Sequence, residues 1–199
     1  QPVIAHTWRR FETAETIQEI ILVVREGMHQ AFQDLATQFG FRKPFRLVHG
    51  GAERQDSVWN GLQALDPACE LVAIHDGARP CVSHALIEAT LAGAAETGAA
   101  VAAQKVSDTL KEATKDGLIA RTVDRARLWA VQTPQTFQTE VILNAISAAR
   151  AQGLNLTDDT AACELIGQHV KLIASPTPNP KVTVPGDLPL VEFLLRSTE

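Results

Sequence analysis

Short apolar runs alternate with amphipathic stretches along the chain, and this pattern predicts an α/β protein. Ile20–Val24 is a compact run of branched side chains, which is typical of a strand. Leu71–Ile74 is uninterrupted and apolar and leads into His75-Asp76-Gly77, which favours a strand buried on both faces of a sheet. Further strands are expected at residues 45–48, 99–103, 128–135, 169–174 and 181–184.

Helices are expected between these strands, and their ends carry recognisable signals. Pro2 suits the first turn of a helix, Ser83 is a good N-cap, and Gly40 and Gly98 are typical helix terminators. One helix is expected to begin at about Pro2 and to place Trp8 and Phe11 on one face. The other expected helices cover residues 28–39, 55–65, 84–97, 139–152, a segment opened by 157–159, and 188–196. The alternation of helices and strands predicts a mostly parallel sheet with right-handed crossovers.

Residues 108–125 interrupt this alternation. They are polar, they turn at Asp116-Gly117, and they have too little apolar surface to be buried on both faces. We therefore expect a β-hairpin that projects from the body, either as an active-site flap or as an arm that grips another subunit.

Composition narrows the class of protein. With 199 residues, 45% of them hydrophobic, the chain is expected to form one globular domain over residues 1–199. A net charge of −5 gives no support to nucleic-acid binding. Three scattered cysteines favour buried thiols in a reducing compartment, and no apolar run approaches membrane-spanning length, so we expect a cytoplasmic protein without a membrane role.

Asp76 and Arg79 directly follow the central apolar run, where open α/β sheets bind ligands. An aspartate can bind a sugar hydroxyl or Mg²⁺, and an arginine can form a bidentate contact with phosphate. A turn-capping aspartate beside a surface arginine is the alternative reading. His75 could act as a general base, but no partner carboxylate or nucleophile stands at a fixed spacing from it, which makes that role a minor alternative.

Two further segments could contact a ligand. Gly50-Gly51 joins a strand to a helix, where small residues let the backbone approach a flat base and Ser57 could bond a base edge. It matches neither a Walker loop nor G-x-G-x-x-G, so a tight structural turn is an equal alternative. Lys181 follows a stiff proline-rich loop, which favours a fixed ammonium able to meet phosphate. Thr157-Asp158-Asp159 is interpreted mainly as a helix cap.

Seven motifs in register carry a family resemblance that spans nearly the whole chain. They are GGAERQDSV (50–58), HDGARP (75–80), VSDTLK (106–111), TVDR (122–125), LWAVQTPQTF (128–137), TDD (157–159) and PKVT-x-PGDL (180–188). Together they resemble the cytidylyltransferase family of the non-mevalonate isoprenoid pathway. That family makes 4-diphosphocytidyl-2-C-methyl-D-erythritol from CTP and 2-C-methyl-D-erythritol 4-phosphate.

The resemblance implies a Rossmann-like, three-layer nucleotidyltransferase fold, a Mg²⁺-dependent reaction, and a homodimer in which residues 108–125 form the dimerisation arm. Its implied substrate-binding residues are Gly51, Ala52 and Ser57 for cytosine, Asp76 and Arg79 for ribose and methylerythritol hydroxyls, Thr122 from the partner for the substrate phosphate, Thr139 at a phosphate-binding position, and Lys181 to orient the substrate phosphate. Lys181 and Asp76 are the implied catalytic residues, and Asp76 is also the candidate metal ligand. The substrate phosphate oxygen would attack the α-phosphorus of CTP in line.

The sequence also departs from the family pattern. A strand and a glycine-rich loop with Arg and a Pro-Lys pair are expected to lie ahead of this chain, so the chain as given is expected to be N-terminally truncated and nearly inactive. Ala52 stands where some members have Asp, Thr139 where some place a phosphate-binding Arg, and Pro180 where an aliphatic residue is usual. These three changes predict a shifted or weaker phosphate pocket and a base contact through the backbone.

The sequence is also compatible with two other functions. A related cytidylyltransferase acting on ribitol 5-phosphate would share the CTP-facing motifs. A non-catalytic nucleotide-binding homologue would have lost the triphosphate loop. A substrate panel distinguishes the first of these from the methylerythritol reading, and the upstream coding sequence distinguishes the second.

Overall fold

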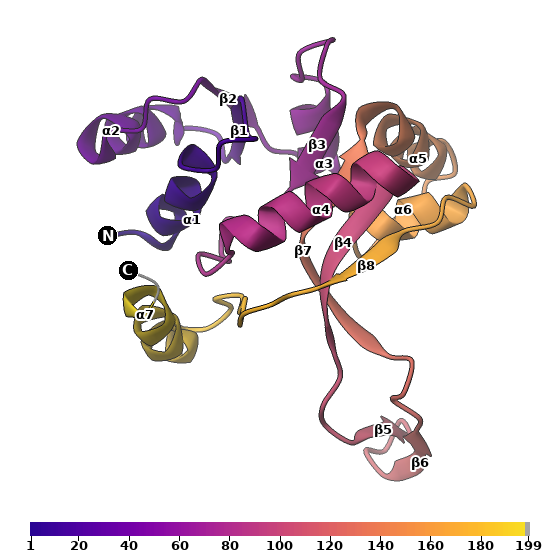
Figure 1. The fold of residues 1–199 in the computed structure, drawn as a ribbon. Helices are drawn as coiled ribbons and strands as arrows, with labels where there is room; N and C mark the ends of the chain where they lie inside the picture. The colour runs from indigo at the N-terminus through magenta and orange to yellow at the C-terminus, as the bar shows by residue number, and fades with distance from the viewer. Residues whose placement is uncertain (198–199) are drawn as a thin grey trace.

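The computed structural model describes residues 1–197, and the elements follow the chain order shown in Figure 1. The helices are α1 (Val3–Glu12), α2 (His29–Phe39), α3 (Arg54–Leu62), α4 (His84–Thr97), α5 (Thr139–Ala151), α6 (Asp159–Leu165), the 3₁₀ turn η1 (Pro185–Asp187) and α7 (Leu188–Arg196). The strands are β1 (Ile20–Val24), β2 (Phe45–His49), β3 (Leu71–Ile74), β4 (Ala99–Lys105), β5 (Leu110–Ala113), β6 (Ile119–Val123), β7 (Trp129–Gln138) and β8 (Lys171–Ala174).

The α/β class is confirmed, but the expectation of a mostly parallel sheet is wrong. The described strands form three small sheets: a parallel β1-β2 pair, a mixed four-stranded sheet in the order β3-β7-β4-β8, and the antiparallel β5-β6 hairpin. Strand β7 runs antiparallel to both β3 and β4. The physical reason is that β4 runs out to the hairpin and β7 returns directly from it, and strands joined by such a return are antiparallel.

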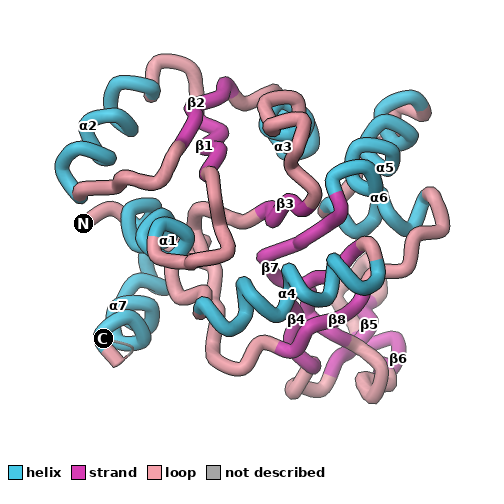
Figure 2. Tube along the Cα trace, turned by 45° about the horizontal axis from the view of Figure 1, so that its top comes forward, coloured by secondary structure: helices cyan, strands magenta, loops and turns pink. Residues whose placement is uncertain are grey.

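Helices cover both faces of the four-stranded sheet (Figure 2). Strand β4 consists of small residues, with Ala99 to Ala103 all at most 1% exposed, as its sequence predicts. Ala102 belongs to a core cluster with Leu86 and Ile87 of α4, whereas Ala99 packs with Ile142 of α5 on the other face. The alternating direction of strand side chains lets one alanine strand serve two helical layers.

Helices α1 and α2 anchor the β1-β2 pair beside this sheet. Trp8 of α1 is 1% exposed and stacks on Phe41 with ring centroids 4.5 Å apart, and Phe45 of β2 meets it edge-on at 5.0 Å. This aromatic cluster joins α1, α2 and β2. Phe11, one turn after Trp8, belongs instead to the core cluster of α4 and β4, so α1 links the two parts of the body.

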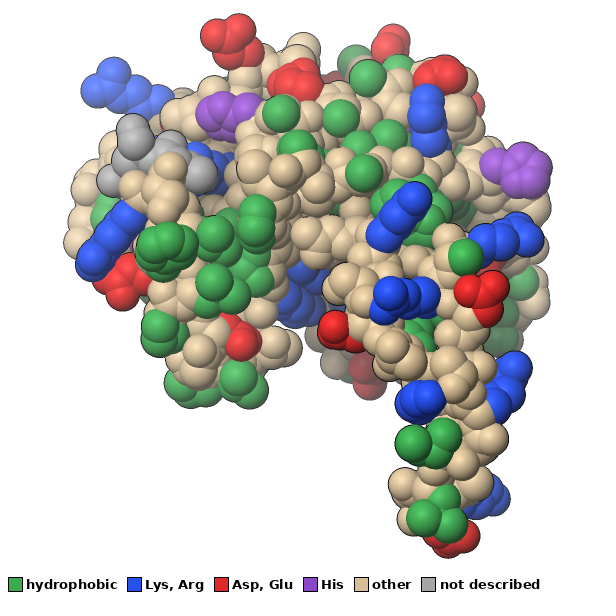
Figure 3. Space-filling view, turned by 60° about the horizontal axis from the view of Figure 1, so that its bottom comes forward, with side chains coloured by type: hydrophobic (Ala, Val, Ile, Leu, Met, Phe, Trp, Pro, Cys, Tyr) green, Lys and Arg blue, Asp and Glu red, His purple; other side chains and the backbone are tan. Residues whose placement is uncertain are grey.

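The predicted hairpin is present. Strands β5 and β6 are antiparallel, and Gly117 adopts φ +78° at the turn, a conformation that glycine reaches without strain. The hairpin extends well away from the body (Figure 1), and the space-filling view shows both hydrophobic and charged side chains on its surface (Figure 3).

Three local predictions were wrong. Strand β3 is half-buried and lies at the end of the β3-β7-β4-β8 order, so it is not buried on both faces. Strand β7 continues through Pro134, because residues 132–134 bulge opposite the single Ala102 and the missing proline N–H breaks no ladder bond there. Residues 181–184 form no strand; instead Asp187 accepts from the backbone N–H groups of Thr183 and Val184.

None of the helices within residues 1–197 is long and apolar enough to cross a membrane.

Candidate active site

The centre of the candidate site is the carboxylate of Asp76, just past the end of β3. Its Oδ2 atom lies 3.2 Å from Nζ of Lys181 and accepts from Nε of Arg79 at 3.3 Å. Burial raises the pKa of Asp76, but the positive charges of Lys181, Arg79 and Arg54 outweigh this, so the pKa lies below its ordinary value. The carboxylate is therefore ionised and held between cations.

Arg79 and Lys181 reach Asp76 from segments far apart in the chain. Nη1 of Arg79 donates to the carbonyl of Asn179 at 2.9 Å, and the N–H of Val182 donates to the carbonyl of Ala78 at 2.9 Å. The proline-rich loop before Lys181 is thereby fastened to the turn that carries Arg79. The loop therefore holds the backbone at Lys181 in place, while the Lys181 side chain remains 44% exposed and able to meet a ligand.

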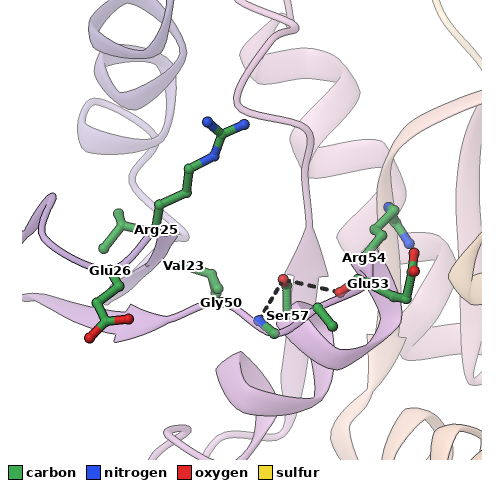
Figure 4. Close-up of a pocket in the computed structure, with 10 residues that line it drawn as sticks. Val23, Arg25, Glu26, Gly50, Glu53, Arg54 and Ser57 are labelled. Carbon is green, nitrogen blue, oxygen red and sulfur yellow. Dashed lines mark hydrogen bonds between the residues drawn. The ribbon is translucent and has the colours of Figure 1, made fainter.

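The glycine turn at residues 50–57 borders a cleft of about 430 Å³. Residues from the end of β1 face those from the start of α3 across it, and Ser57 lies at its floor (Figure 4). Oγ of Ser57 accepts from the N–H of Gly51 at 3.1 Å and donates to the carbonyl of Glu53 at 3.2 Å. Ser57 thus stabilises the turn itself, in addition to facing the cleft.

Gly51 is required by close packing rather than by an unusual dihedral angle. A Cβ atom at Gly51 would lie 2.2 Å from Cβ of Asp56, which no side chain could tolerate without a backbone shift. The N–H of Glu53 also donates to Oδ2 of Asp56 at 3.3 Å. The sequence therefore folds here into a tight, self-bonded turn, with Gly51 and Ala52 lining the cleft.

Arg54 links the cleft to the Asp76 cluster, and sequence reasoning missed it. It lines the cleft, it contributes to lowering the pKa of Asp76, and it forms a bidentate pair with the buried Asp159 at 2.9 and 2.7 Å. Burial nevertheless raises the pKa of Asp159, despite the opposing effect of Arg54. The position of Arg54 inside the GGAERQDSV motif could have indicated a functional role. No local sequence pattern, however, could indicate that its partner is Asp159, 105 residues away.

Asp158 caps α6, as interpreted from the sequence: its carboxylate accepts from the N–H of Ala161 at 3.0 Å. It also accepts from Nε2 of Gln135 at 3.1 Å, and Oε1 of Gln135 accepts from the N–H of Asp159. The cap therefore has a second effect, because it joins β7 to the pair made by Arg54 and Asp159.

Two of the expected site residues lie elsewhere. Thr139 donates from its backbone N–H to the carbonyl of Glu70, at the beginning of β3, whereas Asp76 follows the end of that strand. The strand separates the two, so the structure does not bring Thr139 to the cluster. Thr122 lies on β6 of the projecting hairpin, where its hydroxyl accepts from Nζ of Lys111 at 2.6 Å.

The chain matches one protein family over almost its full length. The family profile described as 2-C-methyl-D-erythritol 4-phosphate cytidylyltransferase matches residues 1–197. A protein of that name from Pelotomaculum thermopropionicum is 41% identical over 199 residues, which are 100% of this chain and 84% of the relative. A bifunctional enzyme from Desulforudis audaxviator is 42% identical, with 98% of this chain and 50% of the relative covered.

Solved structures agree with these sequence matches. The structure titled 4-diphosphocytidyl-2C-methyl-D-erythritol synthase from Anaerococcus prevotii is similar with a TM-score of 0.90 and 30% identity, covering 98% of this chain and 86% of that one. The 2-C-methyl-D-erythritol 4-phosphate cytidylyltransferase of Thermus thermophilus is similar with a TM-score of 0.84 and 33% identity, covering 98% and 90%.

Because relatives match the whole chain, the expectation that it is nearly inactive as given finds no support. The fold, the motifs and these matches agree in assigning the chain to the 2-C-methyl-D-erythritol 4-phosphate cytidylyltransferase family.

Proposed function

We propose that this enzyme transfers a cytidylyl group from CTP to 2-C-methyl-D-erythritol 4-phosphate, releasing pyrophosphate, in the non-mevalonate isoprenoid pathway. Membership of the family supports this function. The structural observation that carries it is the convergence of Asp76, Arg79 and Lys181. Arg54, which lines the cleft at the Gly50–Ser57 turn, links that cleft electrostatically to Asp76. The finer fold description, a Rossmann-like three-layer nucleotidyltransferase domain over residues 1–199, is part of the same proposal.

The Gly50–Ser57 turn is proposed to bind cytosine. Gly51 has no side chain and is exposed at the cleft, so a flat base can approach its backbone, and Ala52 offers only backbone groups for hydrogen bonds to the base. Ser57 bonds both Gly51 and Glu53, so its contribution is to fix the turn as well as to meet the base.

The Asp76 cluster is proposed to bind the sugar and the acceptor. Asp76 is ionised and accepts hydrogen bonds, which suits ribose and methylerythritol hydroxyls. Arg79, next to it, can donate to the same polar groups. Lys181 would direct the acceptor phosphate toward the α-phosphorus of CTP, where its charge stabilises the negative charge that develops during in-line attack. No activated nucleophile is needed for such a reaction.

Mg²⁺ enters this proposal through the substrates rather than through Asp76. Oδ2 of Asp76 already contacts two cationic side chains, which opposes a divalent ion at the same atom. Within residues 1–197 no three His, Cys, Asp or Glu side chains are grouped closely enough to hold a metal. Mg²⁺ commonly uses substrate phosphates as ligands. Bound to CTP, it would neutralise charge on the phosphates, and direct ligation by Asp76 does not fit these contacts.

The hairpin is proposed to be a dimerisation arm. It extends from the body and exposes Leu118 and Ile119 at its tip, each 68% exposed. Because Thr122 lies on this arm, it would reach a substrate phosphate only in the site of a second copy. A closed, two-fold exchange of arms satisfies both observations.

A substrate panel tests the proposed function. The chain is incubated with CTP, Mg²⁺ and either 2-C-methyl-D-erythritol 4-phosphate or ribitol 5-phosphate, and pyrophosphate release is measured. We expect release with the methylerythritol substrate and at most a few per cent of that rate with ribitol 5-phosphate. Equal rates would favour the ribitol enzyme, and nucleotide binding without release would favour a non-catalytic homologue.

A further inference from the structure

Thr133, in the bulged part of β7, has a hydroxyl that lies between a backbone N–H and a histidine ring nitrogen. Its Oγ1 atom lies 3.0 Å from the backbone nitrogen of Asp76 and 3.0 Å from Nδ1 of His75. A backbone N–H can only donate, so Oγ1 accepts from Asp76. A hydroxyl oxygen has two lone pairs, so the direction of the bond between Oγ1 and Nδ1 of His75 is decided by the other ring nitrogen. Thr133 is 3% exposed, so solvent offers little competition for these bonds.

The carbonyl of Arg79 fixes the tautomer of His75. A carbonyl can only accept, so the ring proton of the neutral imidazole is on Nε2, which donates to the carbonyl oxygen of Arg79 at 3.1 Å, and Nδ1 accepts the hydroxyl proton of Thr133. Phe11 packs on the ring with centroids 4.9 Å apart. One chain of hydrogen bonds therefore runs from the N–H of Asp76 through Thr133 and His75 to the carbonyl of Arg79.

This series of hydrogen bonds joins both ends of the Asp76–Arg79 turn, and other hydrogen bonds hold the two residues between them. The carbonyl of Gly77 accepts from the hydroxyl of Thr7 at 2.8 Å, and that of Ala78 accepts from Val182 at 2.9 Å. The carbonyl of Thr133 itself accepts from Nδ2 of the buried Asn179 at 2.8 Å. Thr133 is thus the point where β7, the Asp76 turn and the loop before Lys181 are joined.

We propose that Thr133 and His75 are positioning residues, which fix the directions of the Asp76 and Arg79 side chains through this one-way chain of hydrogen bonds. The proposal rests on the proposed function, in which Asp76 and Arg79 contact the substrates. It also gives His75 a role different from that of a general base, because both ring nitrogens are used within the protein.

Two substitutions at one position test the proposal. Thr133→Val keeps the shape but removes the hydroxyl, and Thr133→Ser keeps the hydroxyl. We expect Thr133→Val to lower kcat about tenfold or more with little change in KM, because the substrates still bind but Asp76 and Arg79 are misdirected. Thr133→Ser is expected to stay within about threefold of wild type. A kcat near that of wild type for Thr133→Val would overturn the proposal.

Thr136 provides a matched control on the same strand. It is fully buried, and its hydroxyl has no hydrogen-bond partner within residues 1–197. Thr136→Val should leave kcat and KM unchanged. All rates are taken per folded protein, well below each unfolding midpoint, so that a simple loss of stability does not resemble a loss of kcat. Equal kcat losses in Thr136→Val and Thr133→Val would overturn the proposal.

Nitrogen NMR of the wild-type histidines provides a test that does not require turnover. At pH 7.5 the His75 ring is expected to carry its proton on Nε2, and this signature should weaken in Thr133→Val. A proton on Nδ1 in the wild-type protein overturns the inference even in an active enzyme. If the wild-type chain releases no pyrophosphate, the proposed function fails, and the NMR result alone decides the positioning role.

Discussion

Nζ of Lys181 lies 3.2 Å from Oδ2 of Asp76, although 105 residues separate them in the chain. The contact is made at the end of β3, where the turn after the strand and the proline-rich loop are tied together by the bonds of Asn179 and Val182. A positive group is thereby held beside the carboxylate proposed to bind the sugar, where an incoming phosphate can meet it.

Removing the charge of Lys181 should impair catalysis far more than stability. Lys181→Met is expected to lower kcat/KM by about 10²–10³, the usual effect of losing one group that stabilises developing charge. The free energy of unfolding should change by less than about 1 kcal/mol, since the side chain is 44% exposed. Pyrophosphate release and chemical denaturation measure the two quantities.

The control for this variant is Lys171→Met. Lys171 pairs with Glu96 at 2.5 Å and is 41% exposed, so it matches Lys181 in chemistry and exposure but lies on β8. It should leave turnover unchanged. Turnover within twofold of wild type in Lys181→Met would remove Lys181 from the site.

Gly51→Ala should weaken CTP binding. The new Cβ atom would lie 2.2 Å from Cβ of Asp56, so the turn must shift. We expect KM for CTP to rise about tenfold and the free energy of unfolding to fall by about 1–3 kcal/mol, as for other overpacked sites. Gly186→Ala, where a Cβ atom meets nothing within 4 Å, is the matched control. An unchanged KM would argue against base binding at this turn.

The pair formed by Arg54 and Asp159 should show strong coupling in a double-mutant cycle. Arg54→Met leaves the 1% exposed carboxylate of Asp159 without its bidentate partner, which should destabilise the fold by on the order of 3 kcal/mol. Adding Asp159→Leu should recover part of that loss, because the unpaired buried charge is then gone. Urea denaturation of the four proteins measures the coupling.

The exposed pair of Arg46 and Glu19 is the comparison for this cycle. Its side chains are 45% and 26% exposed, and Nε and Nη2 of Arg46 both contact the carboxylate, so the geometry is similar but solvent screens it. Its coupling should stay below about 1 kcal/mol. Equal coupling energies in the two pairs would contradict the expectation that burial of Asp159 strengthens its coupling to Arg54.

Acidification should destabilise the fold through His75 between pH 6.5 and pH 4. Burial lowers the pKa of His75 from 6.5 to about 4, with Asp76 and the Arg79 carbonyl opposing this and the Arg79 charge adding to it. The unfolded chain therefore binds the proton first as the pH falls, and about 3 kcal/mol is lost across this window. Unfolding free energies from pH 7 to pH 4 measure the slope.

His75→Asn should flatten that slope, because no proton is then taken up at this position on unfolding. His169→Asn, which changes an exposed histidine, serves as the control and should keep the wild-type slope. A wild-type slope in His75→Asn would show that groups other than His75 cause the loss of unfolding free energy at acidic pH.

If the β5-β6 hairpin is a dimerisation arm, the fraction of dimer should depend on protein concentration. Leu118→Asp and Ile119→Asp together place charge on the exposed tip and should shift a dimer toward monomer in sedimentation equilibrium. Turnover should fall as the dimer is lost, because Thr122 would then no longer reach the neighbouring site. Met28→Asp, on an exposed residue of the body, is the control. A monomeric wild-type enzyme with full activity would contradict the arm's role.

Much of the local structure followed from the sequence because its signals act over a few residues. The strand at Ile20–Val24, the N-cap at Ser83, the helix terminators Gly40 and Gly98 and the hairpin turn at Gly117 were all predicted and are all present. Each depends on side-chain branching, a neighbouring N–H, or glycine's freedom to adopt positive φ. The motifs likewise pointed to Asp76, Arg79 and Lys181 without revealing their distances.

Tertiary structure alone decided how distant segments meet. The antiparallel pairing of β7 with β3, the partnership of Arg54 with Asp159 and the hydrogen-bond chain through Thr133 all depend on contacts across 57 to 105 residues. The half-buried position of β3 likewise depends on its place in the sheet. Local patterns specify which conformation a segment prefers, but not which neighbour it packs against. Pairing and hydrogen-bond direction are set only when the chain is compact, because burial then requires each polar group to find a partner.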